Sequence, residues 1–158
     1  MNKTIFSIFL CSFLAISIFT CVFDKPIYSK AAQAAGNNSQ SMDVQLIARC
    51  VNGESRGESY EGQVAVAAVI LNRIKHPSFP KTLSGVIYQP GAFTAVTDGQ
   101  INVPIDPNAP VFKACSEAMS GSDPTSGAIY YYNPSTATNS WIKGRKVVKT
   151  IGKHNFAI

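Results

Sequence analysis

Glu54 is the residue of this sequence best placed to do chemistry, because a helical pattern runs through residues 42–54 (MDVQLIARCVNGE) and ends on it. An α-helix turns by about 100° per residue, and this rotation places Glu54 on the same apolar arc as Ile47 and Cys50. A carboxylate on such an arc faces protein rather than water, which disfavours its ionised form. A carboxylic acid kept protonated can donate a proton near neutral pH, so the pattern predicts a general acid at Glu54.

Two structural roles for Glu54 stay open on the pattern alone. Gly53 and Gly57 weaken a helix at this point, so the helix could stop early and leave the carboxylate in water. Glu54 could also be a buried structural acid that pairs with Arg56 or Arg73. In either role Glu54 would take no part in catalysis.

A second helix, over residues 64–75, must support this corner of the chain. Residues 64–71 (VAVAAVIL) are apolar at every position, which is compatible with a buried strand or a buried helix. The three alanines of this run and its smooth continuation into residues 72–75 favour a helix. A helix that is apolar all round is a central one, and Pro77 predicts that it ends at His76.

The C-terminal part of the chain changes to a strand pattern. Residues 128–132 (AIYYY) are aromatic and favour a strand, as do residues 146–151 and 154–156, which are joined by a turn at Gly152 and Lys153. We therefore expect a small antiparallel sheet beside a helical core, which is an α+β fold.

The segments between these elements are expected to be short and to serve as scaffold. Residues 82–88 read as a short amphipathic helix, and residues 92–97 as a loop or short strand. Asn108 is expected to cap a helix that runs to about Met119, with Pro110 in its first turn.

Several motifs of this sequence are shared with one bacterial family. The segments NGESRGESYEGQVAVAAVILNR, PGAFTAV and YYNP and the closing Gly-Lys-His-Asn-Phe occur in this order. From about Val44 onward the chain resembles the cell-wall hydrolase family that includes the catalytic domain of the spore cortex-lytic enzyme. The resemblance implies a lysozyme-like helical core around a buried central helix, with a small antiparallel sheet, and it places the single catalytic glutamate of the family at Glu54.

The same resemblance implies which residues bind substrate. Ser55 completes a Glu-Ser pair, and residues 132–133 form a Tyr-Asn pair, that resemble pairs in lytic transglycosylases. Phe93 and Thr94 lie in PGAFTAV, where a ring beside a hydroxyl suits a sugar, although a core position is the alternative for Phe93. A core or lid position is likewise the alternative for Trp141. The residues expected to bind substrate are Ser55, Glu58, Gln63, Phe93, Thr94, Tyr132, Asn133, Trp141 and His154.

A single catalytic glutamate is sufficient for one type of glycan cleavage. Most glycosidases use two carboxylates, and Glu58, Glu61 and Asp98 are available but do not fall on an apolar face. In a lytic transglycosylase the substrate supplies the nucleophile, first through the acetamido group and then through the 6-hydroxyl of N-acetylmuramic acid. The resemblance implies this route in the breakdown of cell wall or spore cortex, as in sporulation and germination. Hydrolysis by a muramidase, an N-acetylmuramoyl-L-alanine amidase or other wall hydrolase, and a non-catalytic glycan-binding module are the alternatives.

Metal and thiol chemistry have little support in the sequence. The chain has two histidines, His76 and His154, and neither has the spacing of a zinc site, so we expect no metal and no cofactor. His154 is expected to form a hydrogen bond near the cleft. Cys50 and Cys115 lie on apolar faces, where they could form a disulfide after export or remain buried thiols.

The N-terminal residues 1–34 are predicted to direct export, as a signal peptide or as a membrane anchor. Residues 5–22 are apolar, and residues 32–34 (AQA) offer a small-x-small cleavage signal. Without cleavage, residues 5–22 would attach the protein to the membrane. A polar linker at residues 35–41 would lead to one catalytic domain at residues 42–158, so we expect the protein in the cell wall, the spore or the extracellular space.

The net charge is consistent with a wall surface rather than a nucleic acid. The whole chain carries +5, and the part after residue 34 carries +3. An excess this small and scattered does not indicate nucleic-acid binding, whereas it suits weak attraction to an anionic wall. We expect peptidoglycan glycan strands as the partner and a monomeric protein.

Overall fold

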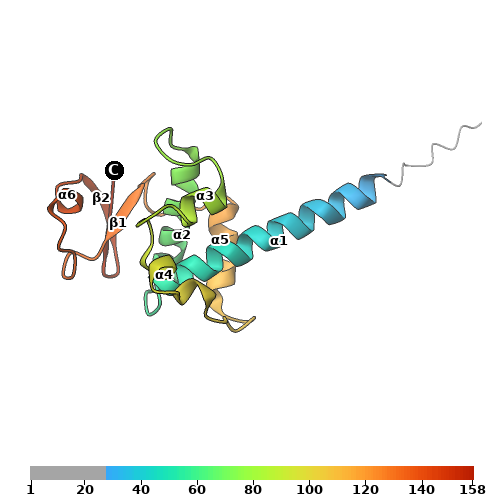
Figure 1. Ribbon diagram of the computed structural model, residues 1–158, viewed down its shortest axis with the longest axis horizontal. Coiled ribbons are helices and arrows are strands. Elements are labelled where there is room, and N and C mark those ends of the chain that lie inside the picture. The colour runs from blue at the N-terminus through green and yellow to red at the C-terminus, as the bar shows by residue number, and fades with distance from the viewer. Residues whose placement is uncertain (1–27) are drawn as a thin grey trace, which may run out of the picture.

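The computed structural model describes the backbone of residues 28–158 and the side chains of residues 41–158, so most of the predicted export segment 1–34 lies outside the described residues. The elements in chain order are α1 (Tyr28–Glu54), α2 (Tyr60–Lys75), α3 (Leu83–Ile87), α4 (Thr94–Thr97), η1 (Gln100–Asn102), α5 (Pro110–Met119), β1 (Tyr130–Tyr132), α6 (Ser140–Lys143), β2 (Val147–Ile151) and β3 (His154–Ala157). The helices gather around α2, α1 extends away on one side, and the strands with α6 lie at the opposite end (Figure 1).

Helix α1 is longer than the sequence pattern predicts. Residues 35–41, which were expected to form a linker, continue the helix without a break. Its C-terminal part packs on the domain, where Ile47, Cys50 and Val51 are fully buried. Among the described helices, none is both long enough and apolar enough to cross a membrane.

Helix α2 is the central helix, as its continuous apolar run predicts. Ser59 caps its first turn by accepting a hydrogen bond from the Gly62 N–H at 3.1 Å. Every residue from Val64 to Ile70 is buried, and the helix packs against both α1 and α5. It ends at Lys75 because His76, which precedes a proline, takes an extended conformation.

Two local predictions are wrong. Residues 92–97 were expected to form a loop or a short strand, but Thr94–Thr97 form the single helical turn α4, closed by a hydrogen bond from the Asp98 N–H to the Thr94 carbonyl. Asn108 does not cap α5, because Ala109 occupies the cap position. Instead, Asn108 donates its own N–H to the Asp106 carboxylate at 2.8 Å. A single turn is too short to show helical periodicity, so its position depends on tertiary contacts.

The predicted sheet is present and antiparallel, in the order β1-β3-β2. The central strand β3 pairs with β1 through Tyr131 and Phe156, and the Phe156 side chain is fully buried. Gly152 makes the turn between β2 and β3 with φ of 57°, in the left-handed region that glycine tolerates. The structure therefore confirms the α+β class.

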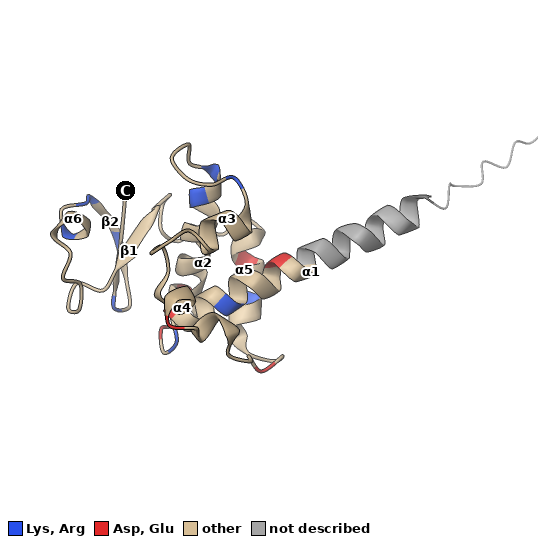
Figure 2. Ribbon diagram, viewed as in Figure 1, with Lys and Arg blue, Asp and Glu red and all other residues tan. Residues whose placement is uncertain are grey.

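The positive charge is concentrated at the sheet end rather than scattered. Figure 2 shows blue without red over α6 and β2. From residue 140 to the C-terminus the sequence contains no aspartate or glutamate. It contains five basic residues there, Lys143, Arg145, Lys146, Lys149 and Lys153. The sequence analysis expected the excess of basic residues to be scattered, and this expectation is wrong, because the excess lies at the sheet end.

The two cysteines of the described region are buried free thiols and form no disulfide. Burial raises the pKa of Cys115 to about 12 and that of Cys50 further above the ordinary value. Both thiols therefore stay protonated, and neither is a nucleophile.

A larger side chain at Ala67 should overpack the core around α2. Ala67 is fully buried, so Ala67→Leu is expected to lower the free energy of unfolding by about 1–3 kcal/mol. Urea unfolding followed by circular dichroism measures this loss. Ser84→Leu, at an exposed position of α3, is the matched control and should leave stability nearly unchanged. Equal stabilities for the two variants would contradict the central position of α2.

Candidate functional site

Glu54 is the last residue of α1 and lies half-buried at the surface of the core. The last turn of the helix is closed by the Ser55 N–H and the Ser55 hydroxyl, which both donate to the Val51 carbonyl, at 2.8 and 2.7 Å. Gly57, with φ of 86°, then turns the chain toward α2. The side chain of Arg56 donates to Gln100 and not to Glu54.

Two donors from distant parts of the chain hold the Glu54 carboxylate. The backbone N–H of Ala95 in α4 donates to Oε1 at 2.6 Å, and the Tyr131 hydroxyl of β1 donates to Oε2 at 2.7 Å. Burial, and then the nearby Glu54, hold the pKa of Tyr131 well above its usual range, so this hydroxyl remains a donor. The carboxylate is therefore fixed in direction and partly shielded from water.

Gly53 allows the close approach of α4 to the end of α1. A Cβ atom at this position would lie 2.5 Å from the Cβ of Ala95 and 3.2 Å from that of Gln100. The absence of a side chain at Gly53 thus places the Ala95 N–H within hydrogen-bond distance of Glu54.

The carboxylate faces an open cleft of about 430 Å³ between the helical core and the sheet. The cleft is lined by the end of α1, by α2 and α4, by β1 with the loop that follows it, and by the start of β3. The lining residues are Gly53, Glu54, Arg73, Ala92, Thr94, Asp98, Tyr131, Tyr132, Asn133, Thr136, Ala137 and His154.

Five of the residues predicted for the site meet in this cleft, namely Glu54, Thr94, Tyr132, Asn133 and His154. Trp141 lines a second pocket of about 300 Å³ that shares residues with the cleft. Phe93 lies beneath the cleft floor with 2% of its surface exposed, and its ring is 4.9 Å from the Arg73 guanidinium carbon. Phe93 is therefore a core residue, which the sequence analysis gave as the alternative to sugar binding.

The structure places the other three predicted residues away from the cleft wall. Ser55 is 1% exposed and hydrogen-bonds to its own helix. Glu58 accepts a hydrogen bond from the Lys153 N–H at 3.2 Å, so it holds the β2–β3 turn. Gln63 lies on α2, where its Oε1 atom is buried without a hydrogen-bond partner among the described residues.

Tyr131 and Arg73 are the main site residues that the sequence analysis did not select. The choice between Tyr131 and Tyr132 depends on the pairing of Tyr131 with Phe156, which no local pattern encodes. Arg73 is 7% exposed although it lies in the last turn of α2, where a basic side chain is normally solvated.

His154 packs against the ring of Tyr131, and the hydrogen bond expected of it is absent among the described residues, where its buried Nδ1 has no partner. Its ring lies at 87° to that of Tyr131, with the centroids 5.4 Å apart, and its Nδ1 is 3.9 Å from Oε1 of Glu58. Burial lowers the pKa of His154, and the carboxylates of Glu58 and Glu54 oppose this only in part. The neutral imidazole is therefore the favoured form.

The fold and the site together define a class of α+β domain in which one half-buried glutamate, held by a backbone N–H and a tyrosine, faces an open cleft. The chain matches the Cell Wall Hydrolase family over residues 57–157. It therefore belongs to the cell wall hydrolase family, and the predicted family is confirmed.

Curated relatives support this membership. The chain is 55% identical to the spore cortex-lytic enzyme of Bacillus cereus over 133 residues, which are 84% of this chain and 50% of that protein. It is 53% identical to the spore cortex-lytic enzyme of Bacillus subtilis over 126 residues, which are 80% of this chain and 40% of that protein. The chain thus spans about half or less of the length of these relatives.

Solved structures show the same fold. The crystal structure of the catalytic domain of the Bacillus cereus SleB protein matches with a TM-score of 0.68 and 59% identity, over 73% of this chain and 89% of that one. The catalytic domain of the germination-specific lytic transglycosylase SleB from Bacillus anthracis matches with a TM-score of 0.68 and 58% identity, over 73% and 93%. These matches confirm the predicted lysozyme-like α+β fold.

Adding one methyl group at Gly53 should disturb the support of Glu54. An exposed glycine-to-alanine change in a helix usually stabilises it by about 1 kcal/mol, but Gly53→Ala should destabilise the fold because the new Cβ meets Ala95. The melting temperature should therefore fall. The double variant Gly53→Ala with Ala95→Gly removes the opposing methyl group and should recover most of the loss. A rise in melting temperature for Gly53→Ala alone would contradict the close approach.

The lowered pKa of His154 predicts a pH dependence of stability. In the unfolded chain His154 binds a proton near the usual pKa of about 6.5, whereas in the folded chain its pKa is lower. The stabilisation of the folded state by neutral His154 is therefore fully present above about pH 6.5. It is lost as the pH falls toward the folded-state pKa. The difference in melting temperature between the wild type and His154→Gln should therefore narrow from pH 7.5 to pH 5, as scanning calorimetry would show. His76→Gln, the change at the other histidine, is the control, and a constant difference for His154→Gln would refute the lowered pKa.

Proposed function

We propose that this chain cleaves the glycan strands of peptidoglycan as a lytic transglycosylase, in the breakdown of cell wall or spore cortex. The observation that carries the proposal is the half-buried Glu54 carboxylate at the cleft, fixed through both of its oxygens. A proton donor must be held in one orientation to reach a glycosidic oxygen, and this arrangement meets the requirement. The name of the Bacillus anthracis relative, a lytic transglycosylase, supports the same reaction.

Glu54 has two successive tasks in this mechanism. In its protonated form it gives a proton to the glycosidic oxygen as the bond to the muramyl carbon breaks, with the acetamido group of the same sugar as the internal nucleophile. The hydrogen bonds from the Ala95 N–H and the Tyr131 hydroxyl hold the remaining carboxylate in place. That carboxylate then takes the proton of the 6-hydroxyl as this oxygen bonds to the muramyl carbon and displaces the acetamido oxygen, which closes the anhydro ring and restores the acetamido group.

Asp98 supports one alternative, a muramidase that releases products by hydrolysis. It is exposed and lines the same cleft as Glu54, so it could activate a water molecule as the second carboxylate. The products separate the two reactions, because transglycosylation leaves 1,6-anhydromuramic ends and hydrolysis leaves reducing ends. Mass spectrometry of muropeptides from purified peptidoglycan distinguishes them.

The partner and location follow from this reaction as part of the proposal. Peptidoglycan lies outside the cytoplasmic membrane, so the protein must be exported, which agrees with the pattern of residues 1–34. The basic sheet end, with residues 143–153 free of acidic side chains, lies beside the cleft and would attract an anionic wall. We propose that the protein works there as a monomer.

Replacing the proposed acid should abolish cleavage without unfolding the protein. Glu54→Gln keeps the shape of the side chain but cannot supply the proton, and loss of general acid catalysis is expected to lower the rate by at least about a hundredfold. Release of soluble muropeptides from peptidoglycan measures the rate, and circular dichroism checks the fold.

Two further variants complete this experiment. Glu61→Gln, an exposed change on α2, should keep wild-type activity. Asp98→Asn should keep most activity if the reaction is transglycosylation and should lose it if Asp98 is the second carboxylate. A folded Glu54→Gln variant with near wild-type activity would show that the proposed acid is wrong.

A further inference from the structure

Arg73 is a buried cation in the last turn of α2. Its side chain is 7% exposed, and within residues 41–158 no carboxylate lies close enough to form a salt bridge with it. Burying a charge without a paired countercharge is costly, and an unbranched apolar side chain would fill a similar space without that cost. Packing alone therefore does not explain why this position carries a charge.

Three aromatic rings surround the guanidinium of Arg73. Its carbon atom lies 4.9 Å from the ring centroid of Phe93, 5.3 Å from that of Phe79 and 5.9 Å from that of Tyr130. Ring faces attract a cation, which offsets part of the cost of burial and keeps the group in one place. The group thus held lines the cleft that contains Glu54.

The end of α2 also holds the segment that leads into β1. The Nε of Arg73 donates to the Ile129 carbonyl at 2.8 Å, and the neighbouring Asn72 donates to the carbonyl one residue earlier at 3.1 Å. Ile129 stands two residues before Tyr131, whose hydroxyl donates to Oε2 of Glu54 at 2.7 Å. The hold of α2 on this segment therefore helps to set where the tyrosine hydroxyl lies.

The positive charge of Arg73 acts on the groups around Glu54. Burial and then Glu54 raise the pKa of both Tyr131 and Cys50, and in each case Arg73 opposes the rise. Burial lowers the pKa of Arg73 itself, while Tyr131 and Glu54 are among the groups that oppose this effect, and a guanidinium remains charged. Arg73 and Glu54 line the same cleft and attract each other.

Arg73 is the one permanent cation among the described residues that line the cleft. The other titratable groups around Glu54 are acids, or a histidine that favours its neutral form. They are Cys50 on the same helix, Asp98 after α4, Tyr131 on β1 and His154 on β3. Without the charge of Arg73, the carboxylate would have no positive group among these neighbours.

We propose that Arg73 is a positioning residue for the acid: it holds the start of β1 so that the Tyr131 hydroxyl reaches Glu54, and it places a permanent positive charge in the same cleft. This role rests on the proposed function of Glu54 and adds a residue that acts through it. A cation near a carboxylic acid favours the form that has given up its proton. Arg73 thereby opposes the effect of burial on Glu54, which suits a group that must release a proton and later take one up.

The pH at which Glu54 titrates can be measured without any cleavage. Protein labelled with 13C at the glutamate carboxyl carbons gives one NMR signal for each glutamate, and the signal that is missing in Glu54→Gln belongs to Glu54. The glutamates of the chain are Glu54, Glu58, Glu61 and Glu117. Arg73→Gln keeps a side-chain donor but removes the charge, so Glu54 should titrate at a pH higher by at least about half a unit.

Arg73→Lys separates the charge from the hold on β1. Lysine keeps the charge but lacks the planar group that donates from Nε and packs on the rings, so Glu54 should titrate near its wild-type pH. The maximal rate of cleavage of soluble peptidoglycan fragments should nevertheless fall by at least about tenfold, because the acid is less well placed. The KM should stay near the wild-type value, since the role of Arg73 lies in placing the acid.

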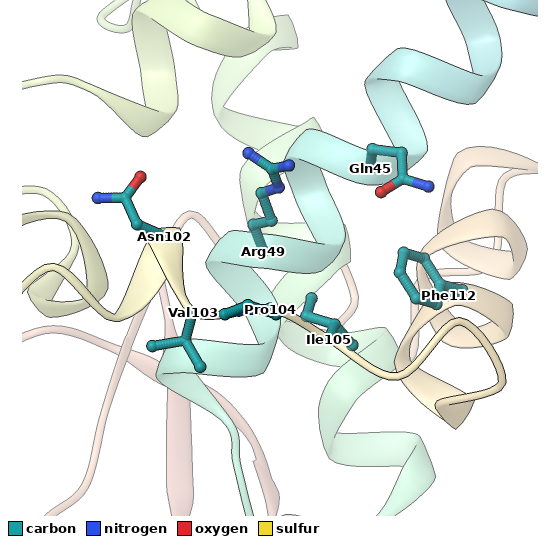
Figure 3. Close-up of a pocket in the computed structure, with 7 residues that line it drawn as sticks. All are labelled: Gln45, Arg49, Asn102, Val103, Pro104, Ile105 and Phe112. Carbon is teal, nitrogen blue, oxygen red and sulfur yellow. The ribbon is translucent and has the colours of Figure 1, made fainter.

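Arg49→Met is the matched control for loss of a positive charge. Arg49 is exposed on α1, and it lines a separate hollow of about 270 Å³ that shares no residue with the cleft. Figure 3 shows Arg49 in that hollow together with Gln45 and Asn102. Because water screens an exposed charge, this variant should leave both the Glu54 titration and the rate of cleavage at their wild-type values.

The outcomes separate this role from the proposed function. An unchanged Glu54 titration in folded Arg73→Gln, or a wild-type rate in folded Arg73→Lys, would overturn the role of Arg73 even if Glu54 proves catalytic. If one of these variants does not fold, as a thermal melt would show, the other decides the matter by itself, and failure of both to fold would leave Arg73 a purely structural residue and overturn the proposal. An active Glu54→Gln enzyme would instead reject the proposed acid, whatever the titration shows.

Discussion

The pair of hydrogen bonds that holds the Glu54 carboxylate is the constraint on which the arrangement of this domain depends. One carboxylate accepts a backbone N–H from α4 and a hydroxyl from β1, so the end of α1, the α4 turn and the edge strand of the sheet must meet at a single point. The separation along the chain is 41 residues to Ala95 and 77 residues to Tyr131. Hydrogen bonds to a charged group are among the stronger ones, and these two join the helical and sheet parts of the molecule at the place where the chemistry is proposed.

The elements with continuous patterns could be predicted from the sequence. The unbroken apolar run of α2 allows no solvated face, so its central position follows from composition alone. Strand β1 follows from its run of tyrosines, and β2 and β3 follow from the two strand patterns on either side of a Gly-Lys turn. The position of Glu54 on the apolar side of α1 follows from helical rotation, which is a local property of the chain.

The remaining features depend on contacts that no local pattern contains. The α4 turn has four residues, and its N–H reaches Glu54 because Gly53 lacks a side chain. Tyr131 rather than its neighbour holds the carboxylate because of the register with Phe156. Arg73 resembles the usual solvated cation at a helix C-terminus until rings from three other segments surround it.

Glu58 connects the sheet to the helical core. Its carboxylate holds the β2–β3 turn through the Lys153 N–H, and a side chain at Gly152 would collide with it, so the hairpin of β2 and β3 is anchored to the start of α2. Glu58 therefore helps to fix the shape of the cleft although its own side chain does not line it, because the turn that it holds leads directly into His154 at the cleft wall.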